Sequence, residues 1–222
     1  MFELVLICGV LALLEMDTTY LGQFLFSRPT CAGAIMGYLC GDFFLGLQAG
    51  IFTELIFIDF VPVGGVVPPS GAICAGIAVI LAGFFGIQIS LAFFIGLICS
   101  LLFSRIEKNI RRYRSKLLPD VEKKLYNGLM MPFLTPGSSQ YEKMKEEGSL
   151  SPLILIIQSF LMEYLVVFAF VLTMASVLGP SLLKFSKHIP ETVSIAFNFS
   201  YFLVPWIGLS MLFISFSTKQ ES

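Results

Sequence analysis

The sequence contains little charge and only one histidine. Asp, Glu, Lys and Arg make up 13% of its 222 residues, against about 25% in soluble domains. None of the four occurs between positions 60 and 104, a run far longer than the roughly 20 apolar residues of one membrane span. With 56% hydrophobic residues, the chain is expected to be an integral membrane protein. Its net charge of −1 excludes a nucleic-acid-binding surface, which needs a basic face.

Motifs for catalysis and metal binding are also missing from the sequence. His188 has no second histidine or cysteine near it, so we interpret it as a surface residue. The five cysteines form no CxxC pair and lie in apolar segments, as expected for small core residues. No nucleophile elbow, P-loop or GxGxxG pattern occurs. We therefore expect no catalytic residue, no metal ion and no cofactor.

One stretch, residues 47–71, combines an apolar sequence with two carboxylates and several helix-breaking residues. Glu54 and Asp59 precede five breakers, which are Pro62, Gly64, Gly65, Pro68 and Pro69. Backbone freed by proline and glycine at membrane depth has to be buried in protein or to line a polar cavity. Ionisable residues beside interrupted membrane helices indicate the substrate site of a transporter. A structural hydrogen bond is the alternative interpretation of Glu54, and solvation at the helix end is the alternative for Asp59.

The remaining sequence predicts an all-α, polytopic membrane protein with short, interrupted and re-entrant helices. Helices are expected at 2–14, 30–39, 43–59, 151–179 and 192–216, with a turn over 180–191. Residues 72–85 and 87–103 form either two helices or one long kinked helix, and Asp42 caps the helix that follows it. We interpret residues 2–14 as a retained membrane segment, because Glu3 stands where a signal peptide carries basic residues.

Most of the basic residues lie in the middle of the chain. Residues 105–147 hold ten of the fourteen Lys and Arg residues, which indicates a cytoplasmic loop. Residues 106–125 are expected to form an amphipathic helix along the membrane surface. The chain is thus divided into a core transport region at 1–104, a basic cytoplasmic connector at 105–150, and two C-terminal spans with a short tail at 151–222.

Three further carboxylates lie in or beside apolar segments. Glu163 falls well inside its predicted span and is expected to pair within the helix bundle. Glu15 and Asp17 follow the first segment, where we interpret them as charges that flank a membrane border.

Four short motifs follow one another between residues 20 and 75. They are QFLFSRP at 23–29, GYLCGDFFLG at 37–46, GIFTELI at 50–56 and VGGVVPP at 63–69. In order and spacing they resemble the IIC membrane subunit of the mannose/fructose/sorbose type of bacterial sugar phosphotransferase system (PTS). The basic connector and the two spans after it fit the same family. Two positions depart from its pattern, since Pro62 stands where many relatives have Asn and Ser70 where an acid often follows the proline.

The resemblance implies a permease subunit in the bacterial cytoplasmic (inner) membrane. Such a subunit pairs with a IID membrane subunit, binds a hexose or amino sugar, and carries it inward by an elevator-like movement. Cytoplasmic IIA and IIB subunits pass phosphate to the arriving sugar, so phosphoryl transfer is expected on these partners. The paired subunits are expected to form a hetero-oligomer that multimerises further.

The resemblance also implies roles for individual residues. Glu54 matches the membrane glutamate of the family's sugar site, and Gly64 and Pro69 match its broken-helix residues, whereas Asp59 has no counterpart in the motif. Together with the position of each residue in the chain, this predicts substrate contacts from Glu54, Gln23, Gly64, Gly65, Pro69 and Asp59. Structural roles are predicted for Arg28, Pro29, Gly41 and Asp42.

Two other functions remain open from the residues alone. A stand-alone ion- or proton-coupled secondary transporter would use Glu54 and Asp59 as proton carriers. A shortened, non-transporting scaffold derived from a IIC subunit would bind the partner subunits without binding sugar.

Overall fold

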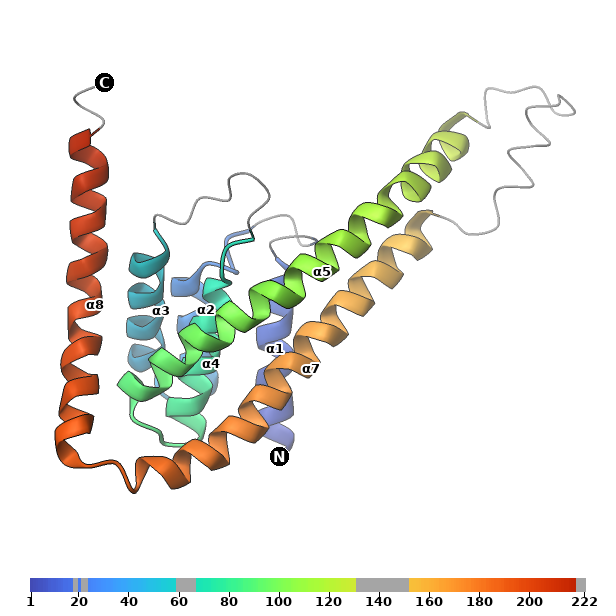
Figure 1. Ribbon diagram of the computed structural model, residues 1–222. Coiled ribbons are helices and arrows are strands. Elements are labelled where there is room, and N and C mark those ends of the chain that lie inside the picture. The colour runs from blue at the N-terminus through green and yellow to red at the C-terminus, as the bar shows by residue number, and fades with distance from the viewer. Residues whose placement is uncertain (18–19, 21–23, 59–66, 131–151, 219–222) are drawn as a thin grey trace, which may run out of the picture. The chain divides into compact units, whose positions relative to one another are not determined.

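The computed structural model describes residues 1–17, 20, 24–58, 67–130 and 152–218, and within these ranges the only regular elements are helices. Figure 1 shows them. The elements are α1 (Phe2–Met16), α2 (Pro29–Leu39), α3 (Phe43–Phe57), α4 (Gly71–Val79), the π-helix η1 (Ile80–Phe84), α5 (Ile89–Met130), α7 (Pro152–Ser186) and α8 (Glu191–Thr218). The all-α prediction is confirmed.

Long and short helices are both present. Among the described residues, three segments are long and apolar enough to cross a membrane, namely Ile89–Lys116 of α5, Ile156–Ser186 of α7 and Glu191–Ile214 of α8. The 15 residues of α3 extend only about 22 Å, which is less than the roughly 30 Å of a hydrocarbon core. Helix α4 with η1 is similarly short. A polytopic membrane fold with short, interrupted helices is therefore confirmed.

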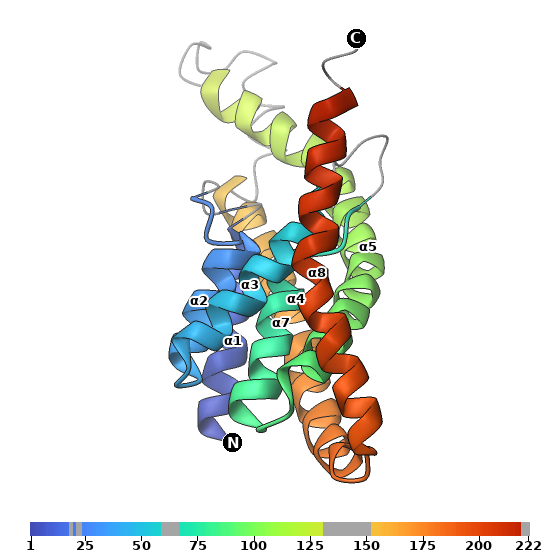
Figure 2. The same ribbon diagram turned by 90° about the vertical axis from the view of Figure 1, so that its left-hand side faces the viewer.

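The chain forms two compact units, Met1–Arg105 with Val166–Ser222, and Ile106–Leu165. In the first unit α1, α2, α3 and α4 lie side by side (Figures 1 and 2), and α8 packs against α3. Its core includes the fully buried rings of Phe93 and Tyr201, whose centroids are 5.1 Å apart. Helix α8 stays largely uncovered, because only 17% of its apolar segment is buried and Trp206 is 70% exposed.

Helices α2 and α3 form a hairpin in which the two backbones touch. Each helix carries two glycines four residues apart, Gly33 and Gly37 on α2, and Gly46 and Gly50 on α3. A methyl group at Gly33 would lie 2.5 Å from the carbonyl oxygen of Gly46, and one at Gly37 would lie 2.7 Å from the Gly46 Cα. Small residues at this spacing allow helices in lipid to approach closely, so the hairpin depends on all four glycines.

The turn of this hairpin contains a helix end and a helix start with no spacer between them. Gly41 adopts φ +86°, which suits the residue just after a helix. The N–H groups of Gly41 and Asp42 donate to the carbonyl oxygens of Tyr38 and Gly37, a Schellman motif that ends α2. The Asp42 carboxylate then accepts the Leu45 N–H at 3.0 Å and caps α3, as the sequence predicts.

Two helices differ from the sequence-based boundaries. The amphipathic helix expected at 106–125 is not a separate element, because α5 continues from its membrane span through the basic residues to Met130. Lys, Arg and Glu are good helix formers and nothing near residue 104 breaks the helix. The turn expected at 180–191 is shorter, since α7 continues past Pro180 to Ser186. Membrane helices tolerate an internal proline. The three-part division of the chain remains a prediction.

The alternative left open at residues 72–103 is decided in favour of two helices. Helix α4 continues into η1, which ends at Phe84, and α5 begins at Ile89. Between them Gly86 adopts φ +70°, a conformation that interrupts a right-handed helix. The separation predicted near residues 83–86 is therefore present.

Candidate functional site

Glu54 lies on α3 and contacts the N-terminal end of α2. Its carboxylate accepts a hydrogen bond from the Thr30 hydroxyl and lies 3.4 Å from Nη1 of Arg28. The Glu54 side chain is 33% exposed and that of Arg28 is 59% exposed. An ion pair this accessible contributes about 1 kcal/mol or less. The carboxylate can therefore exchange Arg28 for a polar ligand at little cost.

The start of α2 is fixed against two other helices. Arg28 is the N-cap and Pro29 the first residue of α2, where a proline ring is pre-organised for a helix. A methyl group at Gly50 of α3 would lie 2.5 Å from the Pro29 carbonyl oxygen, and one at Gly71 of α4 would collide with the Pro29 ring. The starts of α2 and α4 and the middle of α3 thus meet at Pro29, one residue from Thr30.

A buried carboxylate holds the loop that leads into this helix start. Asp17 is fully buried, and its two oxygens accept backbone N–H groups from Phe24 at 3.1 Å, Phe26 at 2.9 Å and Ser27 at 3.4 Å. The next residue is Arg28. The sequence suggests that Asp17 is an ordinary charge at the membrane border. In the structure it is instead a hydrogen-bond acceptor that positions Arg28.

Replacing Asp17 with Asn is expected to lower the stability of the protein. An amide offers one acceptor oxygen instead of two, so a buried N–H loses its partner at a cost of about 1–3 kcal/mol. The loop also holds Leu25 at φ +70°, which is costly for a non-glycine residue. Thermal unfolding of the purified protein in detergent measures the change. Asp42→Asn is the matched control, because Asn caps a helix as well as Asp does; equal melting temperatures in both variants would contradict the role of Asp17.

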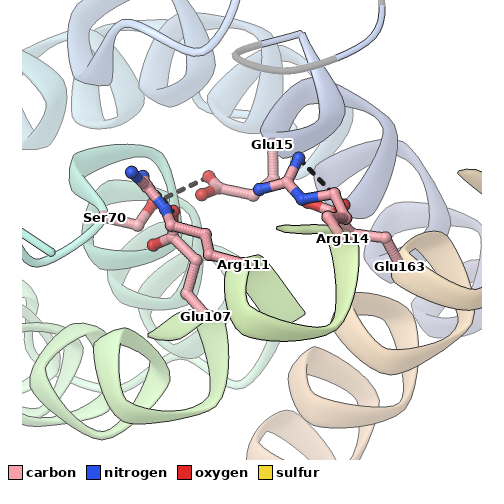
Figure 3. A network of polar contacts seen from close by, with 6 residues as sticks. All are labelled: Glu15, Ser70, Glu107, Arg111, Arg114 and Glu163. Atoms are coloured by element: carbon pink, nitrogen blue, oxygen red, sulfur yellow. Dashed lines mark hydrogen bonds and ion pairs between the residues drawn. The ribbon is translucent and has the colours of Figure 1, made fainter. Parts of the chain in front are cut away.

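A second carboxylate meets the start of α4. The Ser70 hydroxyl donates to Oε2 of Glu15 at 2.7 Å (Figure 3) and accepts the Ile73 N–H at 3.2 Å as the N-cap of α4. Glu15 is 8% exposed, and the positive end of the α4 dipole favours its negative charge. Ser70 thereby connects the end of α1 to the start of α4. A serine before a run of small apolar residues is a capping signal that the sequence does contain.

The structure brings only some of the predicted site residues together. Glu54, Arg28 and Pro29 meet at the start of α2, and the half-buried Pro69 directly precedes the α4 cap. Gly41 and Asp42 lie at the opposite end of the hairpin, where they have capping roles. Four predicted residues fall outside the described parts of the chain, namely Gln23, Asp59, Gly64 and Gly65. The sequence interpretation gave no site role to Thr30, Ser70 or Asp17.

In the part of the chain that the structure describes, the second unit contains one further buried carboxylate. Glu163 of α7 is 8% exposed, and its Oε2 lies 3.3 Å from Nη1 of Arg114 of α5 (Figure 3). The predicted pairing of Glu163 within the helices is therefore confirmed.

Comparison with known proteins extends these observations. A family described as the PTS sorbose-specific IIC component matches residues 1–221. A solved structure described as a membrane protein superimposes with a TM-score of 0.72 at 18% identity, over 97% of this chain and 80% of that chain. A cryo-electron microscopy structure of the mannose transporter ManYZ with microcin E492 gives a TM-score of 0.51 at 18% identity, over 97% and 79%. No curated protein matches.

Proposed function

The chain belongs to the sorbose-specific IIC component family of the phosphotransferase system, and from this premise we propose that it is the sugar-binding permease subunit of a mannose-type PTS. Family membership and three apolar helices make it a multi-pass protein of the inner membrane. The family is a transport component of the system, so the chemistry of phosphoryl transfer is assigned to other subunits. A hexose or an amino sugar is the proposed substrate.

The arrangement around Glu54 supports this proposal. At the junction of short helices, a partly exposed carboxylate lies beside a hydroxyl from Thr30 and a guanidinium from Arg28. A carboxylate accepts hydrogen bonds, a guanidinium donates them, and a hydroxyl does both. A sugar offers a ring of hydroxyl groups that need both kinds of partner. The site thus fits a neutral, hydroxyl-rich ligand, and Glu54 is proposed to accept from two sugar hydroxyls.

The proposed partners follow from the same family. A IID membrane subunit would complete the permease, and cytoplasmic IIA and IIB subunits would supply phosphate. The chain resembles part of the mannose transporter ManYZ in fold, which makes mannose and related hexoses the first sugars to test. The uncovered surface of α8 offers space for a membrane partner.

Sugar uptake by this protein is expected to depend on phosphoenolpyruvate. The chain is co-expressed with a IID subunit and its IIA and IIB partners, and accumulation of labelled sugar phosphate is measured in membrane vesicles loaded with the host's soluble phosphate-carrier proteins, which pass phosphate from phosphoenolpyruvate to IIA. Accumulation should require phosphoenolpyruvate and all four components, because the trapped product is the phosphorylated sugar.

Two other results would contradict the proposal and support a different function. Uptake driven by a pH gradient without phosphoenolpyruvate would identify a proton-coupled secondary transporter. Co-purification with IID but no sugar binding would identify a non-transporting scaffold. The matched control for the uptake measurement omits the IID subunit, because this leaves the chain itself unchanged.

A further inference from the structure

The basic residues of α5 between positions 108 and 116 fall into two groups according to their partners. Arg111 donates from Nε to Oε1 of Glu107 at 2.9 Å, one turn earlier on the same helix. Arg114 pairs with Glu163 at 3.3 Å and is only 22% exposed. Two of the positive charges on this helix are therefore balanced by carboxylates within the protein.

The other group has no such partner among the described side chains. Lys108, Arg112 and Lys116 are exposed, and across the described ranges of the chain none of these three side chains forms an ion pair or a side-chain hydrogen bond. They are spaced four residues apart, so they lie in one row along the helix, about 6 Å apart along its axis. We call this row the basic stripe. It presents three positive charges on a single face, without a partner among the side chains that the structure describes.

The position of the stripe along α5 decides which anion it can meet. The segment of α5 that is apolar enough to cross a membrane, Ile89–Lys116, includes the stripe at its end. The residues before Arg105 carry no charge back to position 60, so the stripe begins where the apolar run has just ended. Basic residues directly beside a membrane span lie at the depth of the lipid headgroups, where anionic lipids attract them.

The side chains that flank the stripe favour a lipid surface over an acidic protein. Tyr113 is 46% exposed and Leu118 is 65% exposed, and by helical spacing they lie in opposite directions around the helix, each roughly a quarter to a third of a turn from Arg112. Aromatic and aliphatic side chains are stabilised between lipid headgroups, where tyrosine is enriched. A bilayer interface accepts the cations and these apolar neighbours together. We propose that the basic stripe is a binding site for the phosphate headgroups of anionic phospholipids.

Lipid selectivity of the full chain in reconstituted bilayers tests this proposal. Spin-labelled phosphatidylglycerol and spin-labelled phosphatidylcholine are compared in phosphatidylcholine vesicles, and the motionally restricted fraction of each gives their relative association constants. The unmodified chain is expected to prefer phosphatidylglycerol by at least about fivefold, which is the effect of one basic residue near the surface. The double variant Lys108→Gln/Arg112→Gln, which keeps one of the three basic residues, should lose most of this preference, and both substitutions lie at exposed positions that leave folding intact.

The matched control is Lys143→Gln/Lys145→Gln, which removes the same charge from the connector. It should keep the preference of the unmodified chain. An equal loss in both double variants would overturn the proposal, because net charge alone would then explain the effect. An unmodified chain that shows no preference would also overturn it. If the stripe variant keeps its lipid preference but loses binding of a cytoplasmic PTS subunit, the stripe is a protein-docking surface instead.

Discussion

Sugar binding is expected to weaken about 100-fold when Glu54 is replaced with Gln. A hydrogen bond to a charged group contributes about 1.5–3 kcal/mol, and the upper value corresponds to roughly two powers of ten in affinity. Gln keeps the size of the side chain but replaces one acceptor oxygen with a donor, so a sugar hydroxyl would face an N–H group. Binding of labelled sugar to vesicles that contain the chain and its IID partner measures the loss.

Glu107→Gln is the matched control for this variant. Glu107 also accepts from an arginine, Arg111, but it belongs to the second unit. We expect unchanged sugar binding and a normal yield of folded protein. Unchanged binding in the Glu54 variant would show that its carboxylate is a structural hydrogen-bond acceptor for Thr30 rather than a ligand group. A loss of folded protein in that variant would lead to the same conclusion.

Loss of the folded state is the expected result of Gly46→Ala. A methyl group there would overlap the Gly33 carbonyl oxygen and lie 2.6 Å from the Gly37 Cα. These obstacles are backbone atoms, so α2 and α3 would have to separate along their contact. Overpacking of a tight core costs about 1–3 kcal/mol where side chains can adjust, and we expect about 3 kcal/mol or more here. Yield and melting temperature in detergent measure the effect.

Gly41→Asn distinguishes a glycine that is needed for close packing, as at Gly46, from one that is needed only for its backbone conformation. A methyl group at Gly41 would meet nothing within 4 Å, and the residue needs only φ +86°. Asn tolerates this conformation better than other side chains, so the variant should fold with nearly unchanged stability. A Gly46 variant as stable as the Gly41 variant would show that the two helices are not in backbone contact.

Local signals explain why much of the fold was predictable from the sequence. The hairpin turn follows from Gly41 and Asp42, because a glycine after an apolar segment ends a helix and the acid beside it starts the next one. The separation before α5 follows from Gly86 in the same way. Pro180 led to the wrong prediction that the helix ends there, because proline ends helices in water more often than in membranes. The sequence-based prediction missed that α5 is one continuous helix. The change from apolar to basic residues suggested a boundary there, although helix propensity indicates no boundary.

The candidate site was only partly predictable because its contacts join distant parts of the chain. Glu54 was identified as a carboxylate in an apolar helix, but its partner Thr30 lies 24 residues away. Glu15 and Ser70 are 55 residues apart, and neither position alone indicates the other. In the sequence Asp17 resembles any acid that follows a membrane segment, and its role is visible only in the hydrogen bonds from Phe24, Phe26 and Ser27. Burial and partners of this kind depend on the tertiary arrangement.

Because α8 is exposed, the tryptophan that it carries is an intrinsic fluorescent probe of the surface of this helix. Trp206 is the only tryptophan of the chain, and it is 70% exposed on a helix that is barely covered. Its emission therefore reports from a single place, with no label to introduce. Brominated lipids will quench it while lipid surrounds α8, and a subunit that packs on this helix will shield it. Partner assembly can thus be followed by titration in the unmodified protein.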